Sequence, residues 1–182
     1  MYSEQKGNNE LLKDVNEMQY MLETYLDFSQ TVSSEEDTEV NLSDLIATII
    51  KTSQEELKSI TFKTPSTKHI KYVCKHIALK RCIINLINNA KAYGDEILIS
   101  IDQVEREIKI TIDDNGPGIE KQDYEKALKP FQRLDYSRNQ NIAGSGLGLS
   151  ISQEIINSIG GNIKLAKSNL GGLRVIIALP IK

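Results

Sequence analysis

Apolar residues in the first thirty positions recur at the spacing of one helix face. They lie four, three, four and three residues apart, in the order Leu11, Val15, Met18, Leu22 and Tyr25. This heptad pattern predicts one helix that ends near Gln30. A single helix of about 20 residues is marginal alone, so this stripe needs a partner. The helix can pack on the rest of the chain or pair in a dimeric bundle, and its acidic outer face favours the bundle.

From residue 41 onward the pattern predicts further helices. They are expected over residues 43–58, 77–93, 121–128 and 147–159. Ser43 is the expected N-cap of the first helix, and the Gly160-Gly161 pair is expected to end the last one. The buried stripe of the second helix is predicted to consist of Leu79, Ile83, Leu86, Ile87 and Ala90.

Alternating apolar and polar residues predict short strands between these helices. The strands are expected at residues 59–63, 69–74, 96–102, 107–113, 162–167 and 173–179. Because helices interleave with strands that tight turns join, we expect an α/β fold: a two-layer α/β sandwich with a mixed sheet and three main helices on one face. The chain then divides into the heptad helix (1–32), an acidic linker (33–40) and a folded body (41–182).

Charge supports this division. The net charge is −3, yet residues 1–40 hold ten acidic residues against Lys6 and Lys13, which leaves +5 on residues 41–182. A mildly basic body with few aromatic residues and no Trp suits a small anionic ligand better than nucleic acid.

No apolar run reaches 18 residues, which predicts no membrane span. Cys74 and Cys82 have no metal-ligand spacing and are typical of free thiols in a reducing compartment.

The first motif with chemical content is Asn85 and Asn89, which lie four residues apart on the helix 77–93. Both are expected to face away from the apolar stripe. An amide oxygen is a hard ligand that Mg²⁺ accepts, and the amide hydrogens can donate to phosphate. Asparagines on a solvent-facing side are also ordinary surface residues, so this motif alone does not decide between the two.

The second motif runs from Asp113 to Gly118, directly after a predicted strand. A carboxylate at a strand end, followed by Gly-x-Gly, can accept a hydrogen bond from an amino group and let a flat ring approach the backbone. The same residue types are also typical of a plain turn.

The third motif, Gly144-Ser145-Gly146-Leu147-Gly148, leads into the last long helix. Free N–H groups at a helix start that is reached through glycines can bind an anion, although a hinge has the same composition. The spacing fits neither a Walker loop nor a Rossmann fingerprint. Between the second and third motifs lie Phe131, Arg133 and Arg138, on a segment expected to be a mobile lid.

The three motifs in this order make the chain resemble the ATP-binding catalytic domain of sensor histidine kinases, in the superfamily that includes gyrase-type and heat-shock-chaperone ATPases. The resemblance covers residues 41–182 and is closest to osmosensor-type kinases, through Lys80-Arg81, Tyr93-Gly94, Asp113-Asp114, Pro130-Phe131 and Gly146–Leu149. It extends into the arm, where residues 1–32 are similar to the turn and second helix of the dimerisation and phosphotransfer hairpin.

This resemblance implies a role for each motif. Asn89 would ligate Mg²⁺ with Asn85 close by, and Asp114 would accept the adenine amino group. Arg133 and Arg138 would act with the two asparagines in catalysis. The remaining nucleotide-binding residues would be Tyr93, Gly116, Gly118, Ile119, Phe131, Gly144, Ser145, Gly146, Leu147 and Gly148.

The implied activity is transfer of the γ-phosphoryl group of ATP to a histidine nitrogen, with ATP and Mg²⁺ as cofactors. The phosphoryl group would then pass to an aspartate of a response regulator receiver domain. The resemblance also implies a homodimer through the N-terminal helix and a cytoplasmic position in a membrane sensor, with no nucleic acid and no direct membrane contact. Amides, cations and glycines suit a reaction in which the protein mainly positions groups and neutralises charge.

Two departures from the family pattern stand out. The histidines are His69 and His76, and neither lies on the heptad helix, so we expect the phosphoacceptor histidine to lie outside this chain. Ala92 stands where relatives carry Lys or Arg, with Lys91 one residue earlier. Two other functions stay open: a serine kinase of the anti-sigma-factor type, and an ATP-gated dimeric regulator without transferase activity of its own.

Overall fold

The computed structural model describes residues 35–53, 59–64, 70–130, 132 and 146–181, together with Gln19 and Leu26. The predicted heptad helix therefore lies outside the described residues, apart from Gln19 and Leu26, which are both helical. Several other residues singled out by the sequence also lie outside them: His69, Phe131, Arg133, Arg138, Gly144 and Ser145.

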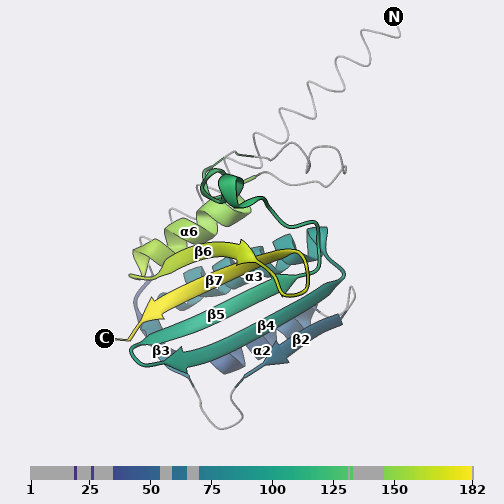
Figure 1. Cartoon of the computed structure of the whole chain (residues 1–182). Helices are drawn as coiled ribbons and strands as arrows, with labels where there is room; N and C mark the ends of the chain where they lie inside the picture. Colours follow the sequence, from purple (N-terminus) through teal and green to yellow (C-terminus); the bar gives the residue numbers. More distant parts are fainter. Residues whose placement is uncertain are drawn as a thin grey trace, which may run out of the picture.

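Five strands form a mixed sheet in the order β2-β4-β5-β7-β6 (Figure 1). Strand β2 runs parallel to β4, and the other neighbours are antiparallel. Strand β7 alternates between buried and more open positions along most of its length, and β4 and β5 do so over their central residues, as the sequence pattern predicted. The bounds are β2 Ser59–Lys63, β4 Glu96–Val104, β5 Glu107–Asp114, β6 Asn162–Lys167 and β7 Leu173–Pro180.

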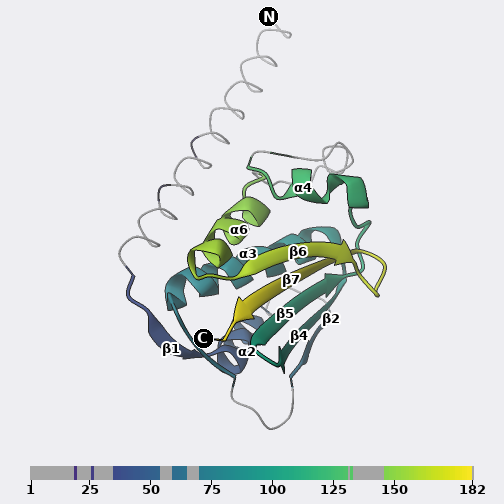
Figure 2. The ribbon, with the colours of Figure 1, turned by 60° about the vertical axis from the view of Figure 1, so that its left-hand side comes forward.

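Three helices cover one face of this sheet: α2 (Leu42–Ser53), α3 (His76–Tyr93) and α6 (Gly148–Ser158) (Figure 2). The stripe predicted for α3 is buried in the core between the helices and the sheet. A short 3-10 turn, η2 (Lys121–Asp123), leads into α4 (Tyr124–Ala127), where the sequence predicted a short helix. The predicted two-layer α/β sandwich is confirmed.

A strand that the sequence did not predict, β1 (Thr38–Asn41), pairs antiparallel with β3 (Lys71–Cys74) in a separate two-stranded sheet. It begins inside segment 33–40, which the sequence assigned to a linker. With four residues and one buried side chain, Val40, β1 has too short an alternation to be detected. Its partner lies more than thirty residues further along the chain.

The start of α2 also differs from the prediction. The helix begins at Leu42, and Asn41 rather than Ser43 satisfies its first turn. Asn41 Oδ1 accepts from the Asp44 backbone N–H at 3.4 Å, and Asn41 Nδ2 donates to Asp44 Oδ2 at 2.6 Å. Asparagine and serine are about equally good N-caps, so composition alone could not choose between two positions two residues apart.

The first turn of α3 is satisfied by a residue distant in sequence. Lys75 at the N-cap position makes no side-chain cap bond, and the first turn contains no acidic residue. Instead, the Glu35 carboxylate accepts from the backbone N–H groups of Ile77 and Ala78, the latter at 3.0 Å. The segment before β1 is therefore attached to the helix that carries Asn85 and Asn89. Among the described residues, no helix is long and apolar enough to cross a membrane.

Candidate functional site

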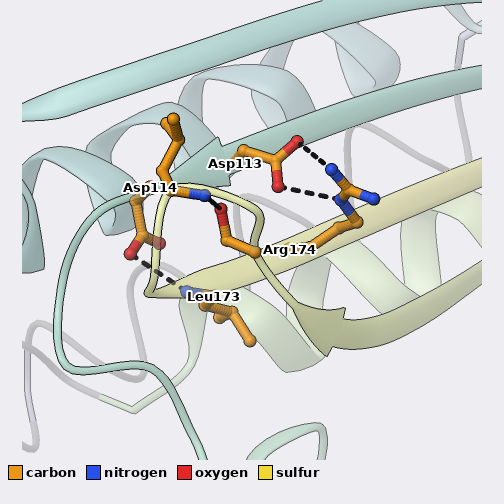
Figure 3. A network of polar contacts seen from close by, with 6 residues as sticks. Asp113, Asp114, Leu173 and Arg174 are labelled. Carbon is orange, nitrogen blue, oxygen red and sulfur yellow. Dashed lines mark hydrogen bonds and ion pairs between the residues drawn. The ribbon is translucent and has the colours of Figure 1, made fainter.

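Asp114 is the last residue of β5, and its side chain lies on the helix-covered face at the end of the sheet. It is only 4% exposed. Its Oδ1 accepts from the backbone N–H of Gly116 at 2.8 Å and of Leu173 at 3.1 Å (Figure 3 shows the bond from Leu173). Within the described part of the chain, nothing donates to Oδ2, and no fully buried side-chain oxygen lacks a partner. Among the described residues, Oδ2 therefore has no donor and is not fully buried, which makes it the candidate oxygen for contact with a ligand.

The surroundings of Asp114 set its acidity. Burial raises the pKa of this carboxyl above its ordinary value of 3.8. The N–H groups of Leu173 and Gly116 oppose that rise in pKa, and the neighbouring Asp113 carboxylate adds to it. A buried carboxyl with a shifted pKa, directly before a turn, is typical of a ligand-binding group.

Glycines allow the backbone to close around this carboxylate. A Cβ on Gly172, in the β6–β7 turn, would collide with Asp114 Oδ1, and a Cβ on Gly116 would lie 2.7 Å from the Tyr93 carbonyl oxygen. Gly118 adopts a φ of 71°, in the left-handed region that disfavours other residues. The second motif is thus a turn whose glycines are required by its contacts.

The same turn is attached to the end of α3. Asn115 Oδ1 accepts from the backbone N–H of Asp95 at 2.8 Å and of Glu96 at 3.0 Å. These bonds hold the C-terminal end of α3, and with it the half-buried Tyr93, against the turn after Asp114. Tyr93 and Asp114, both predicted to bind nucleotide, therefore lie at one end of the molecule.

Asn85 and Asn89 lie on the side of α3 that is turned away from the core. Both are partly exposed, whereas Leu86, Ile87 and Ala90 are buried. Their orientation agrees with the prediction, and they lie on the helix whose end contacts the Asp114 turn. Helix α6 packs along α3, and the Cys82 thiol points at the Ser152 carbonyl oxygen from 3.8 Å.

The beginning of α6 is reached through glycines. Gly146 has a φ of 68°, Leu147 is buried, and the helix starts at Gly148. A Cβ on Gly148 would meet no heavy atom within 4 Å, so packing does not explain this glycine. Because the first N–H groups of a helix have no partner within it, this end can accept an anion.

The side chains of this site suit a magnesium ion that is also bound by the phosphates of a nucleotide. In the described part of the chain, no group of three or more His, Cys, Asp or Glu side chains could hold a metal ion. Mg²⁺ in nucleotide sites takes one or two protein ligands and completes its shell with phosphate oxygens and water. An amide oxygen such as that of Asn89 fits that role.

The structure thus joins the predicted residues Tyr93, Asp114, Gly116 and Gly118 at one end of the sheet, while Ile119 is half-buried against the core. The sequence did not predict the contributions of Asn115, Gly172 and Leu173. The Gly171-Gly172 pair before a predicted strand was a usable signal, because paired glycines mark a close backbone approach. Phe131, Arg133, Arg138, Gly144 and Ser145 lie outside the described residues, so their roles stay predictions.

Comparison with known proteins agrees with this geometry. Residues 74–182 match the family described as "Histidine kinase-, DNA gyrase B-, and HSP90-like ATPase". The chain belongs to this family. The predicted ATP-binding domain of the sensor histidine kinase type is thereby confirmed, whereas the finer likeness to osmosensor-type kinases stays a prediction.

The chain is also similar to individual sensor kinases in sequence and in structure. "Sensor histidine kinase GtrS" of Pseudomonas aeruginosa is 40% identical over 109 residues, which are 60% of this chain and 22% of GtrS. "Sensor protein RstB" of Escherichia coli is 28% identical over 179 residues, 94% of this chain and 41% of RstB. The solved catalytic domain of histidine kinase ThkA superposes with a TM-score of 0.69 at 27% identity, covering 80% of this chain and 95% of that one. The chain therefore spans less than half the length of these curated relatives.

Proposed function

We propose that this chain binds ATP with Mg²⁺ and transfers the γ-phosphoryl group to a histidine of a dimerisation helix. The observation that carries the proposal is the Asp114 carboxylate, with Oδ1 held by two backbone N–H groups and Oδ2 open. In a member of this ATPase family, such a carboxylate suits recognition of the adenine amino group. A phosphorylated aspartate of a response regulator receiver domain would be the final product.

The remaining groups would bind the rest of the nucleotide. Gly116 and Gly172 let the backbone approach the base, and the start of α6 offers N–H groups to the phosphates. Asn85 and Asn89 would donate to phosphate, and Asn89 would hold the metal. Bound Mg²⁺ would neutralise charge on the phosphates during transfer. Arg133 and Arg138 are proposed to act on the phosphates, and Phe131 to lie on the lid.

The position of His76 supports an acceptor supplied from elsewhere. His76 opens α3, and Tyr93 closes it. At a rise of 1.5 Å per residue, His76 and Asn89 lie about 20 Å apart along the helix, too far for His76 to reach a phosphate beside Asn89. The acceptor would therefore come from a dimerisation hairpin, as the resemblance to sensor histidine kinases implies.

The proposed assembly follows from the resemblance of the heptad helix to the second helix of a dimerisation hairpin. We propose that the N-terminal helix pairs in a homodimer and that this chain forms a cytoplasmic portion of a sensor protein. Neither nucleic acid nor direct membrane contact is part of this proposal. The relatives named as sensor histidine kinases do not favour a serine kinase of the anti-sigma-factor type. An ATP-gated regulator would differ from the proposed kinase because it would bind ATP without transferring a phosphoryl group.

A transfer assay separates these functions. The chain is incubated with γ-labelled ATP, alone and with a separately purified dimerisation hairpin that carries an acceptor histidine, and the label is followed by gel. We expect label on the hairpin only, labile in acid and stable in base, and none on the chain alone. Acid-stable label would identify a serine kinase. ATP binding without any label would identify a regulator and contradict the proposed transfer.

A further inference from the structure

Behind the Asp114 site, on the open face of the sheet, lies a second polar contact between the same two strands. Asp113 is 2% exposed, and its two oxygens accept from Arg174 Nε at 2.8 Å and from an Arg174 terminal nitrogen at 3.1 Å (Figure 3). Asp113 and Arg174 are direct cross-strand neighbours, in the last pair of the β5–β7 register. Buried carboxylates rarely stay ionised without such a partner.

This pair lies next to the groups that hold Asp114. Because side chains alternate along a strand, Asp113 and Arg174 point to the open face, while Asp114 and Leu173 point to the helix-covered face. The Leu173 N–H donates to Asp114 Oδ1, and the Gly172 N–H donates to the Asp114 carbonyl oxygen at 3.1 Å. The end of β5 and the start of β7 are thus joined on both faces of the sheet. Asp113 and Asp114 make these contacts from β5, and Leu173 and Arg174 make them from β7.

We propose that Arg174, through Asp113, is a positioning residue for the adenine-binding carboxylate of Asp114. The pair holds the ends of β5 and β7 together, so that the Leu173 N–H stays on Oδ1 and Oδ2 keeps its direction toward the base. This inference rests on the proposed nucleotide binding. Arg174 itself makes no contact with the nucleotide in this account, because its side chain occupies the opposite face of the sheet.

Loss of Arg174 would act on Asp114 through the backbone. Without the guanidinium, the Asp113 carboxylate is buried and unpaired, and water must reach it between the strand ends. That opening moves the Leu173 N–H away from Asp114 Oδ1. Lysine at position 174 would keep the charge but lose the two-bond geometry, because an ammonium group is a point charge.

The test combines Arg174→Met and Arg174→Lys in the full chain with two measurements. The first is hydrogen exchange of the Leu173 amide by NMR without nucleotide, compared with mid-strand amides of β7. The second is calorimetric affinity for ATP and GTP. For Arg174→Met we expect Leu173 exchange to rise and ATP affinity to fall, each on the order of tenfold, while GTP affinity changes little. Arg174→Lys should give smaller changes in the same direction.

Lys71→Met is the matched control, because it removes the cross-strand ion pair of Lys71 with Glu39, at 2.7 Å, on the small sheet. It should change neither measurement. Unchanged Leu173 exchange in both Arg174 variants would overturn the proposal, as would an equal loss of ATP and GTP affinity. If Arg174→Met does not fold, Arg174→Lys decides by the same criteria. If the unaltered chain binds no ATP, the proposed function fails, while Leu173 exchange still shows whether Arg174 positions Asp114.

Discussion

The two oxygens of Asp114 have different surroundings, and this difference gives the residue its chemical role. Oδ1 is used by the fold, since Gly116 and Leu173 both donate to it. Oδ2 has no donor among the described residues and is the proposed contact for the adenine amino group. Because both donors are backbone groups, the direction of Oδ2 is set by the end of β5 and by the β6–β7 turn and depends little on side-chain rotamers.

Acidification should abolish the preference for adenine at a higher pH than for an ordinary aspartate. The amino group needs the ionised carboxylate as acceptor, and burial raises the pKa of Asp114 above 3.8. As the pH falls through that raised pKa, Asp114 takes up a proton and the ATP preference is lost. The ratio of ATP to GTP affinity, measured from about pH 8 to about pH 4, checks this. The Asp114→Asn variant cannot titrate, so its ratio should stay flat, and a flat ratio in the unaltered chain would refute the prediction.

Ala92→Lys should tighten ATP binding. Ala92 is exposed near the end of α3, on the same helical stripe as Asn85 and Asn89. A lysine there would add one charge-assisted contact to phosphate, on the order of 1 kcal/mol. This contact should raise the affinity for ATP several-fold and leave the affinity for adenosine unchanged. Titrations with both ligands measure the gain.

Lys91 is the competing explanation for the missing cation. It is half-buried and already interacts with another group of the protein, and its Cβ lies on a different side of α3 from Asn89. If Ala92→Lys leaves ATP affinity unchanged while Lys91→Ala weakens it, Lys91 already neutralises the phosphates. Position 92 would then not be the place of a missing phosphate-binding cation.

At the scale of elements, helix α3 depends on a carboxylate from outside the helix. Glu35→Ala removes the acceptor for two N–H groups and a negative charge at the helix start. We expect a loss of about 1 kcal/mol in the free energy of unfolding, measured by urea denaturation. Glu36→Ala, at the exposed neighbouring position, is the control and should change little. Equal stability of the two variants would remove Glu35 from the cap.

Local periodicity predicted most elements, because a strand such as β2 or a helix such as α3 shows its pattern over its own residues. Asn41 as the cap of α2 could not be predicted, since Ser43 is an equally good capping residue. The three motifs likewise indicated Asp114 and its glycines. Leu173 and Arg174 could not be found from the sequence, because their roles depend on β7 lying beside β5, and that register is set by the folded sheet.

At the scale of the whole molecule, α3 connects two regions. Its first turn is bound by Glu35, in the segment that leads from the N-terminal residues, and its last residue contacts the turn after Asp114. The same helix contributes Cys82 to the core, and β3, just before it, contributes Cys74.

The two cysteines should report opening of the folded body. Both are free and buried, and burial raises the pKa of each thiol to about 12. A thiol reagent near neutral pH should therefore react only after opening, and ATP should slow the reaction because it binds the folded state. Labelling rates with and without ATP, and in low urea, test this. Rapid labelling that neither ATP nor urea changes would contradict the buried positions.

Nucleotide binding through Asp114 can be measured by calorimetric titration of the chain and of Asp114→Asn with Mg-ATP. Asparagine keeps an oxygen for Gly116 and Leu173 but places an amide in the position of Oδ2, where adenine needs an acceptor. We expect micromolar-to-millimolar binding in the unaltered chain and at least about tenfold weaker binding in the variant, with circular dichroism unchanged. Equal affinity of the two proteins, or no ATP binding by the unaltered chain, would contradict the account.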